Sequence, residues 1–430
     1  MSSAGTTSTT TPAELEARPQ PDMQTGLPPA APAVDMEAVR QPQDRGSRSF
    51  LRQALRDTFQ QTAARLGALW VIVLATLAVL APLIANTHPV LMKPKGGGGW
   101  SSPMLRNLSA VDVTLLAAGA CALALVVSSR LRRPRTLLVM GGIVVVTAVL
   151  GALIANPIVT MDWSRYRDMA RAGQFDSAIW TVIPYSPGDR NTDAPIGEHP
   201  ARPTRKHWLG TERNGADMLS QMIHASRIAL AIGFVSTGIA ATIGVIIGAI
   251  MGYFGGWADL LGMRLIEIMQ ALPRLILLLA IAALLGPNLF LLMVVIGLTG
   301  WTSDARFIRA EFLRLRNQDF VQAAIAAGLP LRSILFRHML ANGITPVLIN
   351  SSFGVASAIL LEAVLAFLGL GDPDRPSWGG LLNQARSGGA NFNWWIAVFP
   401  GLAIFLTVFA YNLVGEAMRD ALDPKLRKRD

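Results

Sequence analysis

Long apolar blocks constrain the fold of this 430-residue chain more than any other feature. Hydrophobic residues make up 51% of the chain and charged residues only 15%. A helix needs roughly 20 mostly apolar residues to cross a bilayer, and a chain in lipid must satisfy its backbone hydrogen bonds internally. We therefore predict an all-α, polytopic membrane protein. The segments that qualify are 66–85, 136–155, 228–254, 346–370 and 394–414, with 111–127 shorter but free of charge after its first residues.

Two weaker apolar segments complete the expected topology. Segment 266–285 is interrupted by Glu267 and Arg274, and segment 288–301 is short. They are either two further spans or one re-entrant hairpin. In both cases they enter and leave the membrane as a pair, so the topology elsewhere is unchanged. We predict about eight spans.

The positions of arginine and lysine predict the orientation, because cytoplasmic loops retain these residues. Four clusters fall on one side if both termini are cytoplasmic. They are Arg45 to Arg65 before the first span, Arg130 to Arg135 between the second and third, Arg306 to Arg337 in a long polar loop, and Lys425 to Arg429.

The net charge of +10 has the same origin. A basic chain often binds nucleic acid, but here the charge follows membrane orientation and contact with anionic lipid. We therefore expect no nucleic-acid partner. The single cysteine, Cys121, lies inside a span, and the five histidines show no metal-ligand spacing, so we propose no metal site.

These patterns divide the chain into six regions. We predict a disordered cytoplasmic tail (1–48), because a Ser-, Thr- and Pro-rich segment buries too little apolar surface to fold, and then a basic amphipathic helix (49–65) at the membrane surface. The remaining regions are three N-terminal spans with a hairpin at 111–155 (66–155), an external segment (156–226), a core of spans (227–418) and a cytoplasmic tail (419–430).

The polar loop 303–345 is the strongest functional signal. Its sequence is amphipathic, and small residues around Gln322-Ala323-Ala324 would let a partner approach the backbone closely. Gly328-Leu329-Pro330 should end one helix and start a second, because glycine tolerates unusual dihedral angles and proline suits a first helical turn. We read the loop as a docking element for another protein; the alternative is a surface helix pair without a special purpose. The residues we select are Asp319, Gln322, Ala323, Ala324, Gly328, Arg332, Arg337 and His338.

The segment 228–254 carries Gly244, Gly248 and Gly252 at four-residue spacing. Small residues at this spacing form a flat stripe on which another helix packs closely. We interpret the stripe as helix packing and not as a pore.

From about residue 183 onward, the chain resembles the inner-membrane permease subunits of bacterial ABC importers for dipeptides, oligopeptides and nickel. Several motifs occur in the same order as in that family. They are IPYSP (183–187), HWLGTE (207–212), GYFGGWAD (252–259), the loop motif with Gln322-Ala323-Ala324 and Gly328, EAVLAFLGLG (362–371), PSWG (376–379), PGLAI (400–404) and RDALDP (419–424).

The resemblance implies a six-span core, to which the hairpin 111–155 is an addition. It also implies that the polar loop couples to a separate ATPase. The chain has no Gly-x-x-x-x-Gly-Lys-Ser/Thr motif, so we expect it to bind no cofactor and to rely on ATP used by partner subunits. Those partners would be a second permease, two ATP-binding cassette subunits and an external substrate-binding protein in the bacterial inner membrane.

The chain departs from the family pattern in three motifs. Gln322 stands where the family usually has Glu, and Ala341 stands where it has Pro. Glu212 replaces Asp, and Gly215-Ala216-Asp217 replaces Gly-Arg-Asp. A charged contact to the ATPase would therefore be a neutral hydrogen bond at Gln322.

Glu362 is the ionisable residue most clearly inside an apolar span. A charge in lipid is costly, so this carboxyl group faces protein or a water-filled path. It either lines the translocation path or holds neighbouring helices together. Asp372, Asp374 and Trp378 follow in an outer loop, where they either line the mouth of the path or form a solvated turn.

Together these features favour a peptide-translocating permease without an enzymatic site of its own. An ion-coupled secondary transporter would place several charged groups at mid-membrane and interrupt helices in both halves. A membrane-embedded enzyme would need a metal cluster or a nucleophile with its base, and we find no such pattern. The cargo itself is not readable from this chain.

Overall fold

The computed structural model describes residues 58–95, 99–127, 134–154, 164–190, 200–387 and 392–422. These residues are mainly helical, with one sheet of two strands, so the all-α prediction is confirmed. Several predicted regions lie outside the described residues. They are the tail 1–48, residues 49–57 of the amphipathic helix, residues 130–133 of the arginine turn and residues 423–430 of the C-terminal tail.

Five helical stretches in the described residues are long and apolar enough to cross a membrane. They are α2 (Thr62–Ile84), α7 (Met218–Phe254), α10 (Leu289–Gly300) joined to α11 (Thr302–Leu315), α15 (Thr345–Phe367) and α17 (Trp394–Leu422). Helices α8 (Gly256–Ala271) and α9 (Arg274–Leu285) reach this criterion only as a pair, which raises the number to six if they form one span. Shorter apolar stretches lie in α4 (Ala110–Val127) and α5 (Pro134–Ile154). The count of about eight spans remains a prediction.

The helix pair α8 and α9 contains a sharp bend within the predicted segment 266–285. The two helices meet at an angle of 77°. Leu272, the residue before Pro273, has extended backbone angles (φ −81°, ψ 125°), because the proline ring disfavours the helical conformation in the preceding residue. The pair is therefore either a broken span or a re-entrant loop, the same two alternatives that the sequence left open.

Helix α11 follows α10 after one residue, and the two together form one apolar stretch that reaches Leu315, so the loop boundary at residue 303 stays a prediction. The polar residues of α11 share the helix with a buried apolar face, as the amphipathic sequence of this segment indicates. Ala305, Ile308 and Phe312 are fully buried, whereas Arg306 and Arg314 are exposed. This 3.6-residue periodicity is typical of a packed amphipathic helix.

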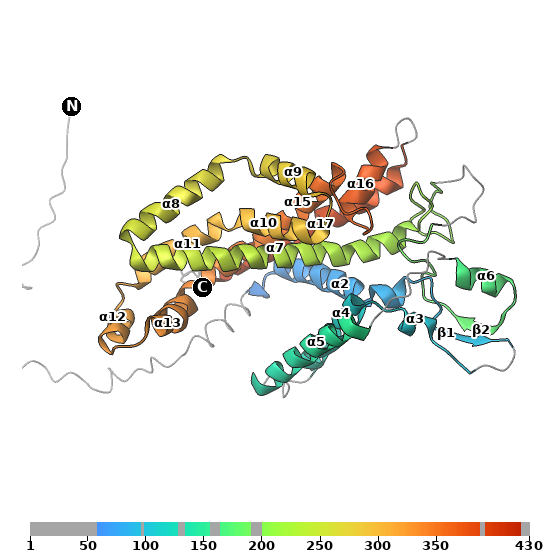
Figure 1. Cartoon of the computed structure of the whole chain (residues 1–430), viewed down its shortest axis with the longest axis horizontal. Helices are drawn as coiled ribbons and strands as arrows, with labels where there is room; N and C mark the ends of the chain where they lie inside the picture. Colours follow the sequence, from blue (N-terminus) through green and yellow to red (C-terminus); the bar gives the residue numbers. More distant parts are fainter. Residues whose placement is uncertain are drawn as a thin grey trace, which may run out of the picture. The chain divides into compact units, whose positions relative to one another are not determined.

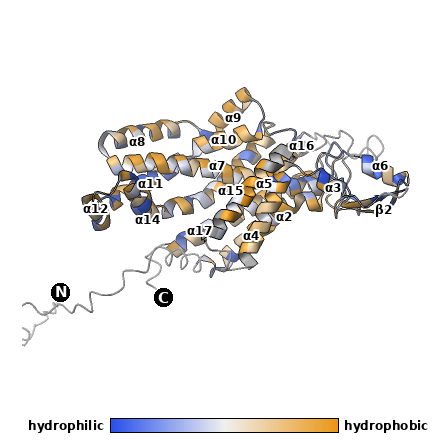
Figure 2. Cartoon of the chain, turned by 60° about the horizontal axis from the view of Figure 1, so that its bottom comes forward, coloured by the Kyte–Doolittle hydropathy of each residue, from blue (hydrophilic) through white to orange (hydrophobic). Residues whose placement is uncertain are grey.

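Helix α7 is the centre of the helical core. It packs against α2, α10, α11 and α15, and α15 packs in turn against α17 (Figure 1). One apolar cluster joins α7 to α15 and α17 through Ala229, Val355 and Tyr411. The apolar side chains that face away from this core match a lipid environment, and Figure 2 shows hydrophobic residues along α2, α8 and α9.

The hairpin 111–155 corresponds to α4 and α5, which pack on each other. Among the described residues of the hairpin, those of α4 contact the core: Gly119 lies against Val79 of α2, and Asp112 pairs with Arg227 of α7 at 2.6 Å. Apolar side chains of α5, such as Val145, are exposed. The hairpin is thus packed at the periphery of the core.

The predicted external segment (156–226) contains a helix and a strand, and the strand pairs with a segment that precedes it, in the predicted region 66–155. Strand β1 (Leu91–Pro94) pairs antiparallel with β2 (Phe175–Ile179), so that Leu91 is opposite Ile179. Short helices α3 (Pro103–Arg106) and α6 (Arg165–Arg171) flank these strands. Figure 2 shows hydrophilic residues at α6.

The chain between α11 and α15 folds into a group of short helices. These are α12 (Asp319–Ala326), α13 (Leu331–Ser333), the π-helix η3 (Ile334–Leu340) and α14 (Ala341–Gly343). Between α15 and α17 lies α16 (Trp378–Arg386), which packs against both.

Candidate functional site

The docking loop, defined from here on as residues 316–344, has its own small core. Val321 and Ala324 of α12 pack with Met339 of η3 and with Phe312 of α11. Ala324 is therefore buried and unavailable to a partner, unlike its exposed neighbours Gln322 and Ala323. The sequence alone could not distinguish these positions, because all of them are compatible with one short helix.

The expected break between the two loop helices lies at Gly328. Helix α12 ends at Ala326, Gly328 has a φ of +69°, and α13 starts directly after Pro330. A positive φ of this size favours glycine, because a Cβ atom would clash with the backbone. No atom lies within 4 Å of the Cβ position of Gly328, so this corner is open.

The other selected loop residues are mostly on the surface. Asp319, Arg332 and Arg337 are exposed. Two side chains turn back onto their own loop: Gln322 donates to the carbonyl oxygen of Arg316 at 2.8 Å, and Nδ1 of His338 lies 3.0 Å from the carbonyl oxygen of Ser333.

Five large apolar side chains are also exposed on the docking loop. Between 39% and 61% of the surface of each is accessible. Several exposed large apolar side chains on one loop that also carries exposed arginines are typical of a surface that another protein covers. The side chains are Phe320, Ile325, Leu329, Leu331 and Phe336.

The glycine stripe of α7 lies directly against α11. A Cβ atom on Gly244 would lie 2.8 Å from the carbonyl oxygen of Trp301, and one on Gly252 would lie 2.7 Å from that of Arg309. Gly248 faces Ala305 in the same way. The two helices are therefore in backbone contact, which couples α7 to the helix that leads into the docking loop.

Glu362 and Trp378 lie inside packed protein and do not line either of the two cavities described below. The carboxyl group of Glu362 is buried and accepts a hydrogen bond from the Ser377 hydroxyl. The Trp378 indole nitrogen donates to the carbonyl oxygen of Met222 at 3.2 Å. These contacts join α15 and α16 to α7, which favours the structural alternative for Glu362.

This placement predicts that Glu362→Gln retains part of the transport activity. The amide keeps the size of the side chain and an acceptor for Ser377, so we expect uptake to fall by less than about tenfold, since a typical buried hydrogen bond contributes only roughly 1 kcal/mol. Glu362→Ala leaves a cavity as well, and should lower the thermal unfolding midpoint of the purified protein. Complete loss of uptake in Glu362→Gln, with normal amounts in the membrane, would instead favour a role in the path.

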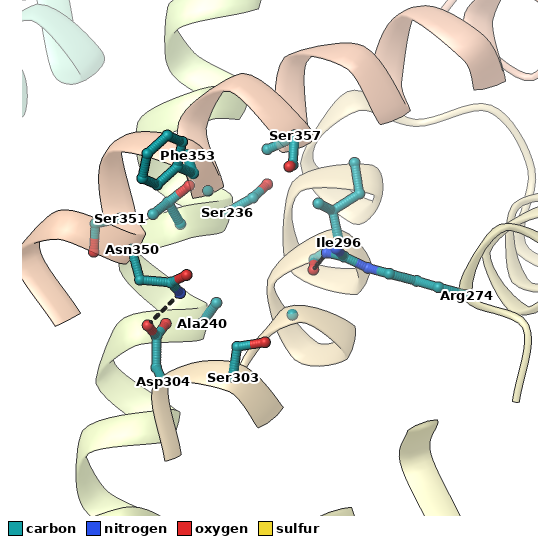
Figure 3. A pocket seen from close by; sticks show the side chains of 14 residues that line it. Ser236, Ala240, Arg274, Ile296, Ser303, Asp304, Asn350, Ser351, Phe353 and Ser357 are labelled. Carbon is teal, nitrogen blue, oxygen red and sulfur yellow. Dashed lines mark hydrogen bonds between the residues drawn. The ribbon is translucent and has the colours of Figure 1, made fainter. Parts of the chain in front are cut away.

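A polar cavity of about 140 Å³ lies between the spans, and we call it the Arg274 cavity. Side chains from α7, α9, α11 and α15 face it (Figure 3). Asn350 donates to a carboxyl oxygen of Asp304 at 2.7 Å, and Arg274 donates to the carbonyl oxygen of Ile296 at 3.0 Å. In the part of the chain that the structure describes, neither Arg274 nor Asp304 forms an ion pair.

The residues of this cavity do not stand out together in the sequence. In the sequence, Arg274 is a charge that interrupts the apolar segment 266–285, and Asp304 lies within the predicted polar loop 303–345. Asn350, a polar amide within the span 346–370, was a usable signal. Charged groups between membrane helices are expected to face a water-filled space or a partner, and the three residues meet only through tertiary packing.

A second, larger cavity of about 540 Å³ lies at the opposite end of α7 from the docking loop, and we call it the Glu212 cavity. The two ends of α7 are about 55 Å apart, because the helix has 37 residues that each rise about 1.5 Å. Asp372 and Asp374 line this cavity together with Glu212 and Gln384, and their place at the mouth of a path stays a prediction. Asp372 also accepts from the backbone N–H of Asp374 at 3.0 Å.

Glu212 is the buried carboxyl group of this second cavity. Only 4% of its surface is accessible. Burial raises its pKa above the usual value, and hydrogen bonds from the side-chain amides of Gln384, Gln221 and Asn214, followed by the charge of Arg190, partly oppose that shift.

The sequence of the chain is similar to those of known membrane transport proteins. Residues 244–428 match the family model described as "Binding-protein-dependent transport system inner membrane component". The chain is similar to the oligopeptide transport system permease protein OppC of Haemophilus influenzae (39% identity, over 53% of this chain and 74% of that protein). It is also similar to the inner membrane ABC transporter permease protein YejE of Escherichia coli (32% identity, over 87% of this chain and 98% of that protein).

Two further similarities were found. The glutathione transport system permease protein GsiD of Pectobacterium atrosepticum is 38% identical over 52% of this chain and 75% of that protein. Among solved structures, an inward-facing conformation of the MetNI methionine ABC transporter covers 48% of this chain and 98% of that chain, with 18% identity and a TM-score of 0.39.

Proposed function

The chain belongs to the family of inner membrane components of binding-protein-dependent transport systems, and from this premise we propose that it is the permease subunit of an ATP-driven peptide importer. The family places it in a bacterial inner membrane as a membrane-spanning transport component. Peptide cargo is supported by the names of its relatives, which include oligopeptide and glutathione permeases. The substrate itself belongs to the proposal.

The exposed apolar side chains of the docking loop are the observation that carries this proposal. We assign them to the interface with a separate ATP-hydrolysing subunit, which would cover Phe336 and the other exposed apolar side chains and face Arg332 and Arg337. The loop is tied to the core, because Arg316 donates to the carbonyl oxygen of Tyr253 at 3.4 Å and α11 lies against the glycine stripe. A movement of the ATPase would therefore shift α11 and α7 together as a rigid unit.

The proposed path runs between this chain and a second, homologous permease. The Arg274 cavity supplies polar groups for its membrane part, and the Glu212 cavity supplies its outer mouth. An external binding protein would deliver the peptide to that mouth. In this topology both termini are cytoplasmic, since the arginine-rich docking loop faces the ATPase.

A crosslinking experiment tests the proposed docking. Phe336→Cys, made in a chain whose Cys121 is replaced by serine, is expected to crosslink to the ATPase subunit when the complex is expressed with its partners. Trp208→Cys is a matched control, because Trp208 is equally exposed (60% against 61%) but lies near the other end of α7.

Equal crosslinking of both variants, or none from Phe336→Cys in an active complex, would contradict the docking surface. Reconstitution in vesicles tests the energy source in parallel. Uphill uptake by this chain alone, without any ATPase, would instead indicate an ion-coupled transporter.

A further inference from the structure

Two residues that line the Glu212 cavity each carry a buried acceptor atom that has no hydrogen-bond donor among the described residues. The atoms are Oε2 of Glu212 and Oε1 of Gln384. The three side-chain amides that approach the Glu212 carboxylate leave its Oε2 atom unsatisfied. A buried acceptor without a partner costs free energy, and most native proteins avoid it.

The backbone around Glu212 holds this arrangement in place. Gly210, with a φ of +82°, turns the chain before Glu212, and the backbone N–H of Glu212 donates to the carbonyl oxygen of Ala216 at 2.9 Å. Gln384 is on α16, which is capped by Ser377 and packs against α15 and α17. The two acceptors therefore belong to separate elements, the segment before α7 and helix α16.

The chemistry of the two acceptors favours a donor that carries positive charge. An ammonium group has three donors and no acceptor, so it can satisfy both oxygens and neutralise the carboxylate. A metal ion is less suitable, because the described residues contain no group of three or more His, Cys, Asp or Glu side chains arranged to hold one.

The size and charge of the cavity suit a small organic ligand better than an isolated ion. Its volume of about 540 Å³ lies within the range of small-ligand sites, roughly 300–1,000 Å³. Asp374 adds negative charge, Asp372 forms an ion pair with Arg375 at 3.7 Å, and Arg190 provides a positive group whose charge also acts on Glu212. This mixed lining suits a ligand with a charged amino end and a polar backbone.

We propose that the Glu212 cavity binds the protonated amino terminus of the transported peptide, with Glu212 Oε2 and Gln384 Oε1 as its acceptors. This inference rests on the proposed peptide-importer function and adds a recognition site to it. Such a site would select for a free amino terminus at the entrance of the path.

Equilibrium binding of radiolabelled trialanine tests the proposal, with the full chain in nanodiscs together with its partner subunits but without the binding protein. We expect Glu212→Gln to weaken trialanine binding by about tenfold or more, since hydrogen bonds to charged groups contribute more than neutral ones. Gln384→Leu should have a smaller effect in the same direction. Glu267→Gln is the control, because Glu267 is an exposed carboxylate on α8 paired with Arg264.

The blocked peptide N-acetyl-trialanine provides the second measurement, and it should compete poorly with trialanine for the wild-type protein. Equal affinity of wild type and Glu212→Gln, or equal competition by the blocked peptide, would overturn the proposal and leave water as the partner of the two oxygens. Weaker association of the binding protein with Glu212→Gln, at unchanged trialanine affinity, would assign the site to a lysine of that protein and overturn the peptide assignment.

ATP-driven uptake is measured separately from trialanine binding, so that failure of the site and failure of the proposed function can be distinguished. If the wild-type complex takes up peptide with ATP but the wild type and Glu212→Gln bind trialanine equally well, only the proposed amino-terminus site is refuted. Absence of ATP-driven peptide uptake by the wild-type complex refutes the proposed function.

Discussion

Replacing Gly248 by leucine is expected to remove most of the folded protein from the membrane. A Cβ atom at this position would meet the backbone of Ala305 and lie 2.9 Å from Cβ of Ile308, so helices α7 and α11 would have to separate. Inserted bulk in a packed core typically costs 1–3 kcal/mol, and more when backbone atoms obstruct it. The measurement is the amount of monodisperse protein extracted from membranes in a mild detergent.

Gly238→Leu provides a matched control for this substitution. Gly238 lies on the same helix, but no atom is within 4 Å of its Cβ position, and both changes alter helix propensity in the same way. We expect Gly238→Leu to accumulate like the wild type. Equal yields of the two leucine variants would mean that the close contact between α7 and α11 is not required for folding.

The second large effect is expected at the corner of the docking loop. Gly328→Phe should abolish peptide uptake while the protein remains in the membrane, because the space around Gly328 is open within the chain and a phenyl ring would project into the proposed ATPase interface. We expect the ATPase subunit to be lost on co-purification, and uptake to fall by at least about tenfold, which corresponds to roughly 1.4 kcal/mol.

Gly328→Ala separates steric blockage from backbone strain. Both substitutions force a Cβ atom into the left-handed region, at a cost of roughly 1–2 kcal/mol, but alanine adds almost no bulk. If alanine abolishes uptake as completely as phenylalanine, the conformation of the loop and not its surface is decisive. Co-purification of Gly328→Phe with a fully substrate-stimulated ATPase would count against docking at this corner.

Much of the helical architecture was predictable from local features of the sequence. Apolar blocks identified the clear spans, and Gly328 and Pro330 marked a break in the loop that the structure also has. The amphipathic pattern after residue 303 did not indicate where its apolar face packs: in the structure Ile308 and Phe312 are buried and α11 packs against α7.

The candidate sites were harder to predict, because the relevant contacts are distant in sequence. Glu362 stood out as a charge in an apolar span, but its hydrogen bond to Ser377 and its burial depend on how α16 folds back on α15. Asp304 and Asn350 gave no joint signal, although they are hydrogen-bonded in the structure.

Local residue order was thus sufficient for the membrane-spanning character of the chain, the close-packing stripe of α7 and the corner at Gly328, since these features depend on nearby residues and on backbone geometry. Tertiary packing decided which polar groups are buried, which face a cavity and which remain without a partner. Glu212 and Gln384 show the reason: the environment of a polar group depends on segments far away in the chain, and only the folded helices bring those segments together.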